Sequence, residues 1–226
     1  MHRRTLACAL MALALSLIAP AAASAWAPAA TAPIHPDVQT HTEGAQCTTN
    51  FIFEEGATVF VGQAAPCSGT GGETETNGCP SGSLPIGTAV EVTGATQPGE
   101  LAYNSWLTMQ AKGESDENTC AYNDLALVQL DTADIGSVNP SVPGFGGPEG
   151  VGGPANEGGG WTHLVTTLTP GIPGDSGSGF LDALGNAFGV LSTLDLARLS
   201  GSNGSVTWPR SSPTNTPTAR SRTSNW

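Results

Sequence analysis

A serine in a glycine-rich turn is the first feature of this sequence that points to chemistry. Residues 173–179 read Pro-Gly-Asp-Ser-Gly-Ser-Gly, with Ser176 at the centre and an apolar run after them. Glycines beside a serine let the backbone fold tightly, so that amide N–H groups converge on an oxygen that becomes negative during acyl transfer. The plainer alternative is a glycine- and serine-rich turn between two strands.

An aspartate at the start of an apolar run is the second feature. Asp124 follows Asn123 and precedes residues 125–130, Leu-Ala-Leu-Val-Gln-Leu, for which we expect a buried strand. An aspartate held away from water can orient a histidine ring and stabilise its charged form. The alternative is that Asp124 ends the turn at Asn123, a common use of aspartate.

In this order along the chain, the two motifs resemble those of the secreted, bacterial-type chymotrypsin/trypsin-like serine peptidases. The resemblance covers residues 47–200. It implies an all-β, chymotrypsin-like double β-barrel and hydrolysis of peptide bonds by an acyl-serine mechanism. By resemblance, Ser176 is the nucleophile, Asp124 is the orienting carboxylate, and the N–H groups of Gly174 and Ser176 form the oxyanion hole.

The resemblance fails at the histidine. The family has Ala-Ala-His-Cys after its first strands, whereas this chain has Ala64, Ala65, Pro66 and Cys67. Pro66 therefore occupies the histidine position and cannot accept a proton from Ser176. A serine hydroxyl is a poor nucleophile without an adjacent base, and loss of the triad histidine in another serine protease cost on the order of 10⁶ in turnover. We expect this chain to be inactive or strongly impaired.

The other histidines do not restore the triad. His35 and His41 precede the first cysteine of the body, and His163 stands thirteen residues before Ser176. The family geometry places none of them between the aspartate and the serine. We interpret all three as surface or core histidines.

Substrate binding is predicted by the resemblance alone. Pro170, six positions before the nucleophile, stands where the family sets the charge preference of its substrate pocket. It is not acidic, so it does not favour an arginine or lysine of the substrate. Ser192, Thr193 and Leu194 resemble the strand along which a substrate backbone pairs. Leu194 replaces a frequent glycine, so we expect a narrowed pocket that prefers small side chains.

The N-terminus is organised like a secretory signal peptide. His-Arg-Arg at positions 2–4 precedes an apolar run over 6–19, and small residues at 23–25 offer a cleavage site. The run is too short to span a bilayer. We expect residues 1–25 to be a signal peptide and the mature protein to be secreted, extracellular and without a membrane partner.

Four cysteines follow this segment: Cys47, Cys67, Cys79 and Cys120. An even number in an exported chain indicates two disulfides, and the spacing alone leaves three pairings open. The resemblance implies a Cys47–Cys67 bond, and we expect Cys79–Cys120 as the second pair. Because the short cysteine spacing of a zinc site is missing, we expect neither a metal nor an organic cofactor.

The body of the chain is strongly acidic. Between Trp26 and Asn203, two basic residues, Lys112 and Arg198, stand against all nineteen acidic ones, which gives −17, whereas the whole chain carries −12. This charge argues against nucleic acid as a partner. Lys112 and Arg198 are also the only cations in the body for Asp175, a residue that the family buries against a positive group.

Short apolar and β-branched runs separated by glycine, proline, asparagine and serine predict an all-β fold. We expect hairpin turns at 54–56 and 182–186. The strands are expected over residues 51–53, 58–61, 88–92, 101–109, 125–130, 162–168, 179–181 and 187–191.

These elements divide the chain into a signal peptide (1–25), an N-terminal arm (26–46), a first β-barrel (47–135), a Gly/Pro-rich connection (136–160), a partial second β-barrel (161–203) and a disordered tail (204–226). The resemblance implies an incomplete second barrel, because Ser176 follows Asp124 by 52 positions, fewer than the family uses for the opening strands of that barrel. The tail is rich in serine, threonine, proline and arginine and lacks an apolar pattern. We expect the first barrel to survive limited proteolysis as a fragment that ends near Leu130.

Two other functions stay open. A non-catalytic pseudoprotease would hold a peptide or protein in the substrate groove without cutting it. A truncated gene product would have no function. For the peptidase and the binding protein alike, we expect a monomer whose partner is a peptide or protein substrate or ligand.

Overall fold

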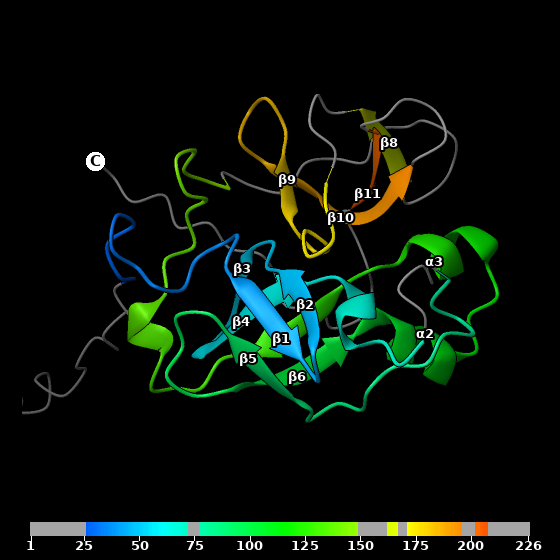
Figure 1. The fold of residues 1–226 in the computed structure, drawn as a ribbon, viewed down its shortest axis with the longest axis horizontal. Helices are drawn as coiled ribbons and strands as arrows, with labels where there is room; N and C mark the ends of the chain where they lie inside the picture. Colours follow the sequence, from blue (N-terminus) through cyan, green and yellow to red (C-terminus); the bar gives the residue numbers. More distant parts are fainter. Residues whose placement is uncertain (1–25, 72–76, 149–161, 167–170, 196–201, 208–226) are drawn as a thin grey trace, which may run out of the picture.

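The computed structural model describes residues 26–71, 77–148, 162–166, 171–195 and 202–207, and these form mainly β-strands. The strands make two antiparallel sheets, one of seven strands and one of four. Figure 1 shows the smaller sheet above the larger one, with two short helices at one end. The predicted fold class, all-β with an incomplete second barrel, is confirmed.

The seven-stranded sheet curves into a barrel because its two edge strands are consecutive in the chain. The Thr49 N–H donates to the carbonyl oxygen of Val38 at 2.8 Å, and the Asn50 N–H donates to that of Gly62 at 2.8 Å. In spatial order the strands are β2 (Ala45–Thr48), β1 (Gln39–Thr42), β5 (Ala89–Val92), β6 (Gly99–Asn104), β7 (Ala126–Gln129), β4 (Thr58–Gln63) and β3 (Ile52–Glu55). One bent segment, residues 49–50, therefore continues the pairing of β2 with β1 and the pairing of β3 with β4, and so joins the two ends of the sheet.

Alternate residues of these strands fill two different cores. Val59 and Val61 of β4 pack inside one cluster with Val128 of β7, whereas Phe60 and Leu127 pack in another. The second cluster includes Ala187 and Leu181 from the smaller sheet. Both faces of β4 and β7 are thus buried, which is why their sequences are nearly continuous apolar runs.

The four-stranded sheet has the order β8 (Thr162–Thr166), β11 (Ser202–Thr207), β10 (Ala187–Asp195) and β9 (Gly179–Leu181). The predicted turn at 182–186 joins β9 to β10. It is held by the Asp182 carboxylate, which accepts hydrogen bonds from the N–H groups of Leu184 at 2.8 Å and Asn186 at 2.9 Å. Within the described residues, β8 and β9 remain as edges.

Three sequence predictions are wrong at element level. The arm predicted over 26–46 contains β1 and the start of β2, because the residues that β1 turns inward are threonines rather than apolar residues. The strand predicted over 101–109 ends at Asn104, where α2 (Ser105–Lys112) begins. Asn104 caps this helix by accepting a hydrogen bond from the Trp106 N–H at 2.8 Å.

The third correction concerns the tail. The segment predicted as disordered from 204 onward begins inside β11, which pairs with both β10 and β8. Backbone hydrogen bonds to neighbouring strands on both sides stabilise β11, although its polar sequence does not predict a strand. Residues 208–226 and the signal-peptide prediction at 1–25 lie outside the described residues.

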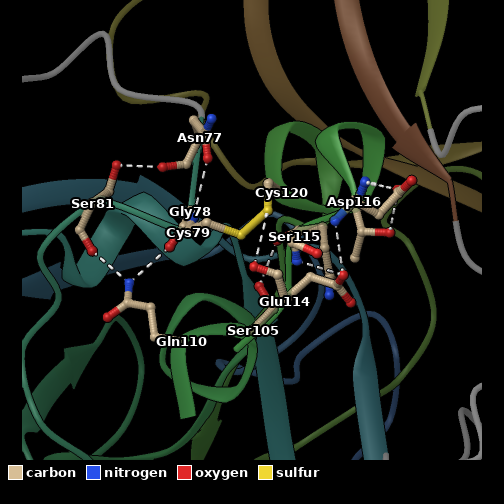
Figure 2. Close-up of a disulfide and its surroundings, with 12 residues drawn as sticks. Asn77, Gly78, Cys79, Ser81, Ser105, Gln110, Glu114, Ser115, Asp116 and Cys120 are labelled. Carbon is tan, nitrogen blue, oxygen red and sulfur yellow. Dashed lines mark hydrogen bonds between the residues drawn. A yellow bond between two sulfur atoms is a disulfide. The ribbon is translucent and has the colours of Figure 1, made fainter. Parts of the chain in front are cut away.

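Both predicted disulfides are present. Cys47 of β2 bonds to Cys67 in the short 3-10 helix η1 (Ala65–Ser68), and Cys79 bonds to Cys120 in α3 (Glu117–Tyr122). Figure 2 shows the second bond and the Gln110 side chain beside it. The amide of Gln110, a residue of α2, donates to the carbonyl oxygens of Gly78 and Ser81, each at 2.7 Å. The loop around Cys79 is therefore held to α2 as well as to α3.

Candidate functional site

The turn that carries Ser176 is fixed to the barrel through β2. The Thr48 N–H donates to the carbonyl oxygen of Ser176 at 2.9 Å, and the Thr48 hydroxyl donates to that of Gly174 at 2.8 Å. On its other side the turn joins β10, where Gly177 and Ser178 exchange hydrogen bonds with Leu191. Two sheets therefore hold the serine in place.

Ser176 is partly exposed, and its described hydrogen bonds use its carbonyl oxygen. The same is true of Gly174. The N–H groups of both residues, the predicted oxyanion donors, thus have no hydrogen-bond partner among the described residues. Gly174 has φ of +102°, which favours glycine at this position.

Asp124 lies just before β7 and is 3% exposed. Its Oδ1 atom accepts a hydrogen bond from the Ala65 N–H at 2.5 Å. Burial raises the pKa of Asp124 to about 6, against the lowering effects of the Ser192 hydroxyl and the Ala65 N–H. Although Ser192 is near enough to lower this pKa, no group in the described part of the chain completes a well-directed hydrogen bond to the buried Oδ2 atom.

Ser105, at the start of α2, holds the backbone on both sides of Asp124. Its hydroxyl donates to the carbonyl oxygen of Asn123 at 2.7 Å and accepts from the Leu125 N–H at 3.1 Å. Ser105 itself is fully buried. The sequence analysis did not identify it, because a serine after a strand carries no distinctive signal.

Pro66 lies between one residue that contacts Asp124 and another that contacts Ser176. Its predecessor Ala65 binds Asp124, and its successor Cys67 has its sulfur 4.0 Å from the carbonyl oxygen of Ser176. A proline in the first turn of a helix loses no hydrogen bond, so η1 accommodates it. Its ring provides neither a base nor an N–H donor at this position.

The histidines that the structure describes are engaged elsewhere. His35 forms a contact of 2.5 Å between its Nδ1 atom and the carbonyl oxygen of Pro36. His41 lies on β1 opposite Gln46 and Glu91. For His163 the structure describes the backbone, which pairs in β8 with that of β11.

The predicted substrate-binding residues are only partly described. Ser192 stands beside Asp124 at an irregularity in β10, and the backbones of Thr193 and Leu194 pair with β11. Pro170 and the side chains of Thr193 and Leu194 lie outside the described parts of the chain.

Asp175, whose partner the sequence leaves open, has a local one among the described residues. Its carboxylate accepts a hydrogen bond from the Ile172 N–H at 2.9 Å, in an exposed setting. A short turn satisfies this side chain because three residues separate acceptor and donor.

The described residues hold no group of three or more histidine, cysteine or acidic side chains suited to a metal ion. Among them, too, no helix has the length and apolar character needed to cross a membrane.

No protein-family model and no curated protein matches this chain. Among solved structures it is similar to Thermobifida fusca Protease A, with a TM-score of 0.47 and 17% identity over 78% of this chain and 91% of that one. It is also similar to a Nocardiopsis protease, with a TM-score of 0.45 and 15% identity over 77% and 91%. A third is a Cellulomonas bogoriensis chymotrypsin, with a TM-score of 0.42 and 17% identity over 78% and 91%.

Proposed function

We propose that this chain is a secreted homologue of the trypsin-like serine endopeptidases that keeps the parts for acyl-serine chemistry but hydrolyses ordinary peptides poorly or not at all. One observation carries the proposal. Pro66 stands between Ala65, whose N–H binds Asp124, and Cys67, which contacts the backbone of Ser176. The acid and the nucleophile are thus fixed on the two sides of a position that lacks a base.

In this proposal Ser176 is the nucleophile and Asp124 the carboxylate that would orient a base. The N–H groups of Gly174 and Ser176 would stabilise the negative oxygen of the tetrahedral intermediate. In another serine protease that lost its triad residues, the oxyanion hole and substrate binding still accelerated hydrolysis roughly 10³- to 10⁴-fold over the reaction in water. This sets the scale of any residual hydrolysis.

The substrate would pair with β10. The pairing of β10 with β9 ends at Val190, and the hydrogen bonds with the serine turn end at Leu191. From Thr193 onward, the described pairing of β10 is with β11 alone. One edge of this segment is therefore available to an extended peptide, with Leu194 favouring a small side chain.

The same edge supports the alternative function, a pseudoprotease that binds a peptide or protein without cutting it. β-strand addition needs backbone hydrogen bonds and no catalytic base. Secretion, the remaining part of the proposal, is supported by two disulfides, which persist in oxidising compartments.

Pro66→His tests the proposed function. The substituted full-length chain should hydrolyse an unstructured protein substrate such as denatured casein at least about 10²-fold faster than the unsubstituted chain, the lower range for general-base catalysis. Pro66→Ala is the matched control, because it removes the ring without supplying a base. A folded Pro66→His chain with no gain would overturn the proposal, and circular dichroism would establish that it is folded.

A further inference from the structure

The Oδ2 atom of Asp124 is the one acidic oxygen among the buried polar atoms that lack a partner in the described structure. The others are the neutral groups Thr42 Oγ1, Asn50 Nδ2 and Trp106 Nε1. A buried carboxylate that is only half satisfied is costly, and more so than a neutral group. The chain therefore keeps an acceptor in a place where its described residues provide no well-directed donor.

This acceptor lies beside the elements that hold the serine. The carboxyl group of Asp124 is approached by Ala65 at the start of η1 and by Ser192 of β10. The residue before Ser192 is Leu191, which exchanges hydrogen bonds with the serine turn. A donor that reaches Oδ2 beside Pro66 would therefore lie between Asp124 and the turn that carries Ser176.

The group that fits this position needs an N–H on one side and a basic atom on the other. Neutral imidazole has both, because one ring nitrogen donates while the other accepts. An amide side chain offers the donor but no base, and a lysine or arginine offers no acceptor. The chemistry thus selects histidine.

We propose that a histidine of the bound peptide completes the site, so that this chain cleaves selected histidine-containing peptides. The inference rests on the proposed function. The substrate imidazole would donate its Nδ1–H to Oδ2 of Asp124 and present Nε2 to the hydroxyl of Ser176. Because Oδ2 is buried, the imidazole would have to displace the groups that cover it, and it would then supply the base that Pro66 does not provide.

The proposed step needs no further reactant. As the Ser176 oxygen bonds to the scissile carbonyl carbon, its proton moves to Nε2 of the imidazole. That proton passes to the leaving amine as the C–N bond breaks, and the neutral imidazole is restored. When the histidine belongs to the acyl fragment, it stays bound after the amine leaves. Water then attacks the acyl-serine in the same manner and releases the acid and the free hydroxyl.

Matched peptides test this inference. A set of quenched fluorescent peptides would carry one histidine at successive positions around a single scissile bond, each paired with a peptide that has glutamine there. For at least one position we expect kcat/KM on the full-length chain to be about 10²-fold higher with histidine, the lower range for a general base. The kcat/KM of that histidine peptide should rise with pH, with a midpoint at about 6.5, as the substrate imidazole loses its proton.

Variants separate the two proposals. Pro66→His should cleave both peptides of each pair at similar rates, Ser176→Ala neither, and Asp124→Asn should lose the preference for histidine. If Pro66→His cleaves both while the unsubstituted chain discriminates at no position, the substrate-histidine inference is overturned and the proposed function stands. If folded Pro66→His also cleaves nothing, both proposals fail.

Discussion

The carbonyl oxygen of Thr48 lies against Gly177 so closely that a Cβ atom on Gly177 would stand 2.4 Å from it. Gly177 also has φ of +96°, a conformation that residues with side chains rarely adopt. The contact joins two backbones, so no side chain can rotate to relieve it. The turn that carries Ser176 thus fits against β2 only with glycine at 177.

Gly177→Ala should therefore lower the free energy of unfolding by about 2–5 kcal/mol, the sum of the conformational and overpacking penalties. Gly56→Ala is a suitable control. Gly56 also has a positive φ, +62°, but nothing lies within 4 Å of its Cβ position. It should lose only about 1–2 kcal/mol. Urea unfolding measures both, and equal losses would contradict a tight contact with Thr48.

Ser105→Ala tests how Asp124 is positioned. The change removes the hydroxyl partner of the Asn123 carbonyl and the Leu125 N–H, both near a buried carboxylate, and should cost about 1–3 kcal/mol of stability. Exposed Ser115→Ala is the control and should be neutral. In a Pro66→His background, Ser105→Ala should lower kcat more than it changes KM. A purely structural role would leave both constants unchanged in the fraction that folds.

The sequence predicted most of the barrel because its strands carry their own pattern. Residues 58–61 and 125–130 are apolar on both faces, and the structure buries both faces. Strand β1 was missed because Thr40 and Thr42 point inward, so its buried positions look polar. The helix α2 was missed because apolar residues at 101–109 resemble a strand, and a single cap at Asn104 decides otherwise.

The candidate site could be predicted from the sequence only where side chains form it. Ser176 and Asp124 stand out by type and neighbours, and Pro66 stands at the position that the resemblance assigns to a histidine. The contacts of the Ala65 N–H and the Ser105 hydroxyl could not be predicted. Every residue except proline has a backbone donor, and the sequence does not distinguish a buried serine from an exposed one. The unpartnered Oδ2 of Asp124 emerges only from three-dimensional packing.

The buried carboxyl of Asp124 predicts how stability depends on pH. Its pKa is raised from 3.8 to about 6 on folding, so between these values the folded chain binds more protons than the unfolded one. Stability must then fall as the pH rises from about 4 to 6, by about 3 kcal/mol if this group acts alone. Asp124→Asn keeps the acceptor for Ala65 and should remove this part of the slope. Urea titrations at intervals of one pH unit compare the two chains, and parallel curves would refute the assignment.

Active-site labelling offers a measurement that does not depend on finding a substrate. A peptidyl phosphonate reacts with a serine hydroxyl as its proton is removed, so the unsubstituted chain should react slowly at Ser176. Pro66→His should accelerate labelling by about 10²-fold. Mass spectrometry locates the adduct, with Ser178→Ala as a control that keeps Ser176. Fast labelling of the unsubstituted chain would show that another base already serves this serine.

Limited proteolysis tests the unequal completeness of the two sheets. The edge strands β2 and β3 of the first sheet are consecutive in the chain and are joined through Thr49 and Asn50, whereas the second sheet ends in the separate edges β8 and β9 within the described chain. Free edge strands open more readily. From the sequence we predict a protected fragment that ends near Leu130, but the structure extends the barrel further. Val138 is fully buried in the barrel core, and the Asn139 N–H donates to the carbonyl oxygen of Ile34 at 2.9 Å.

The fragment should therefore begin before Ile34 and end after Asn139. The Cys47–Cys67 and Cys79–Cys120 bonds both lie within it, and a protease that cuts at many residue types would define it by mass. Cutting should begin in the chain after Phe145, which is 85% exposed. Reduction of the disulfides should shorten its lifetime, since cross-links restrict the unfolded chain. If the second sheet persists as long as the barrel, its open edges do not weaken it, and the serine turn is anchored more firmly than its bonds to Thr48 and Leu191 indicate.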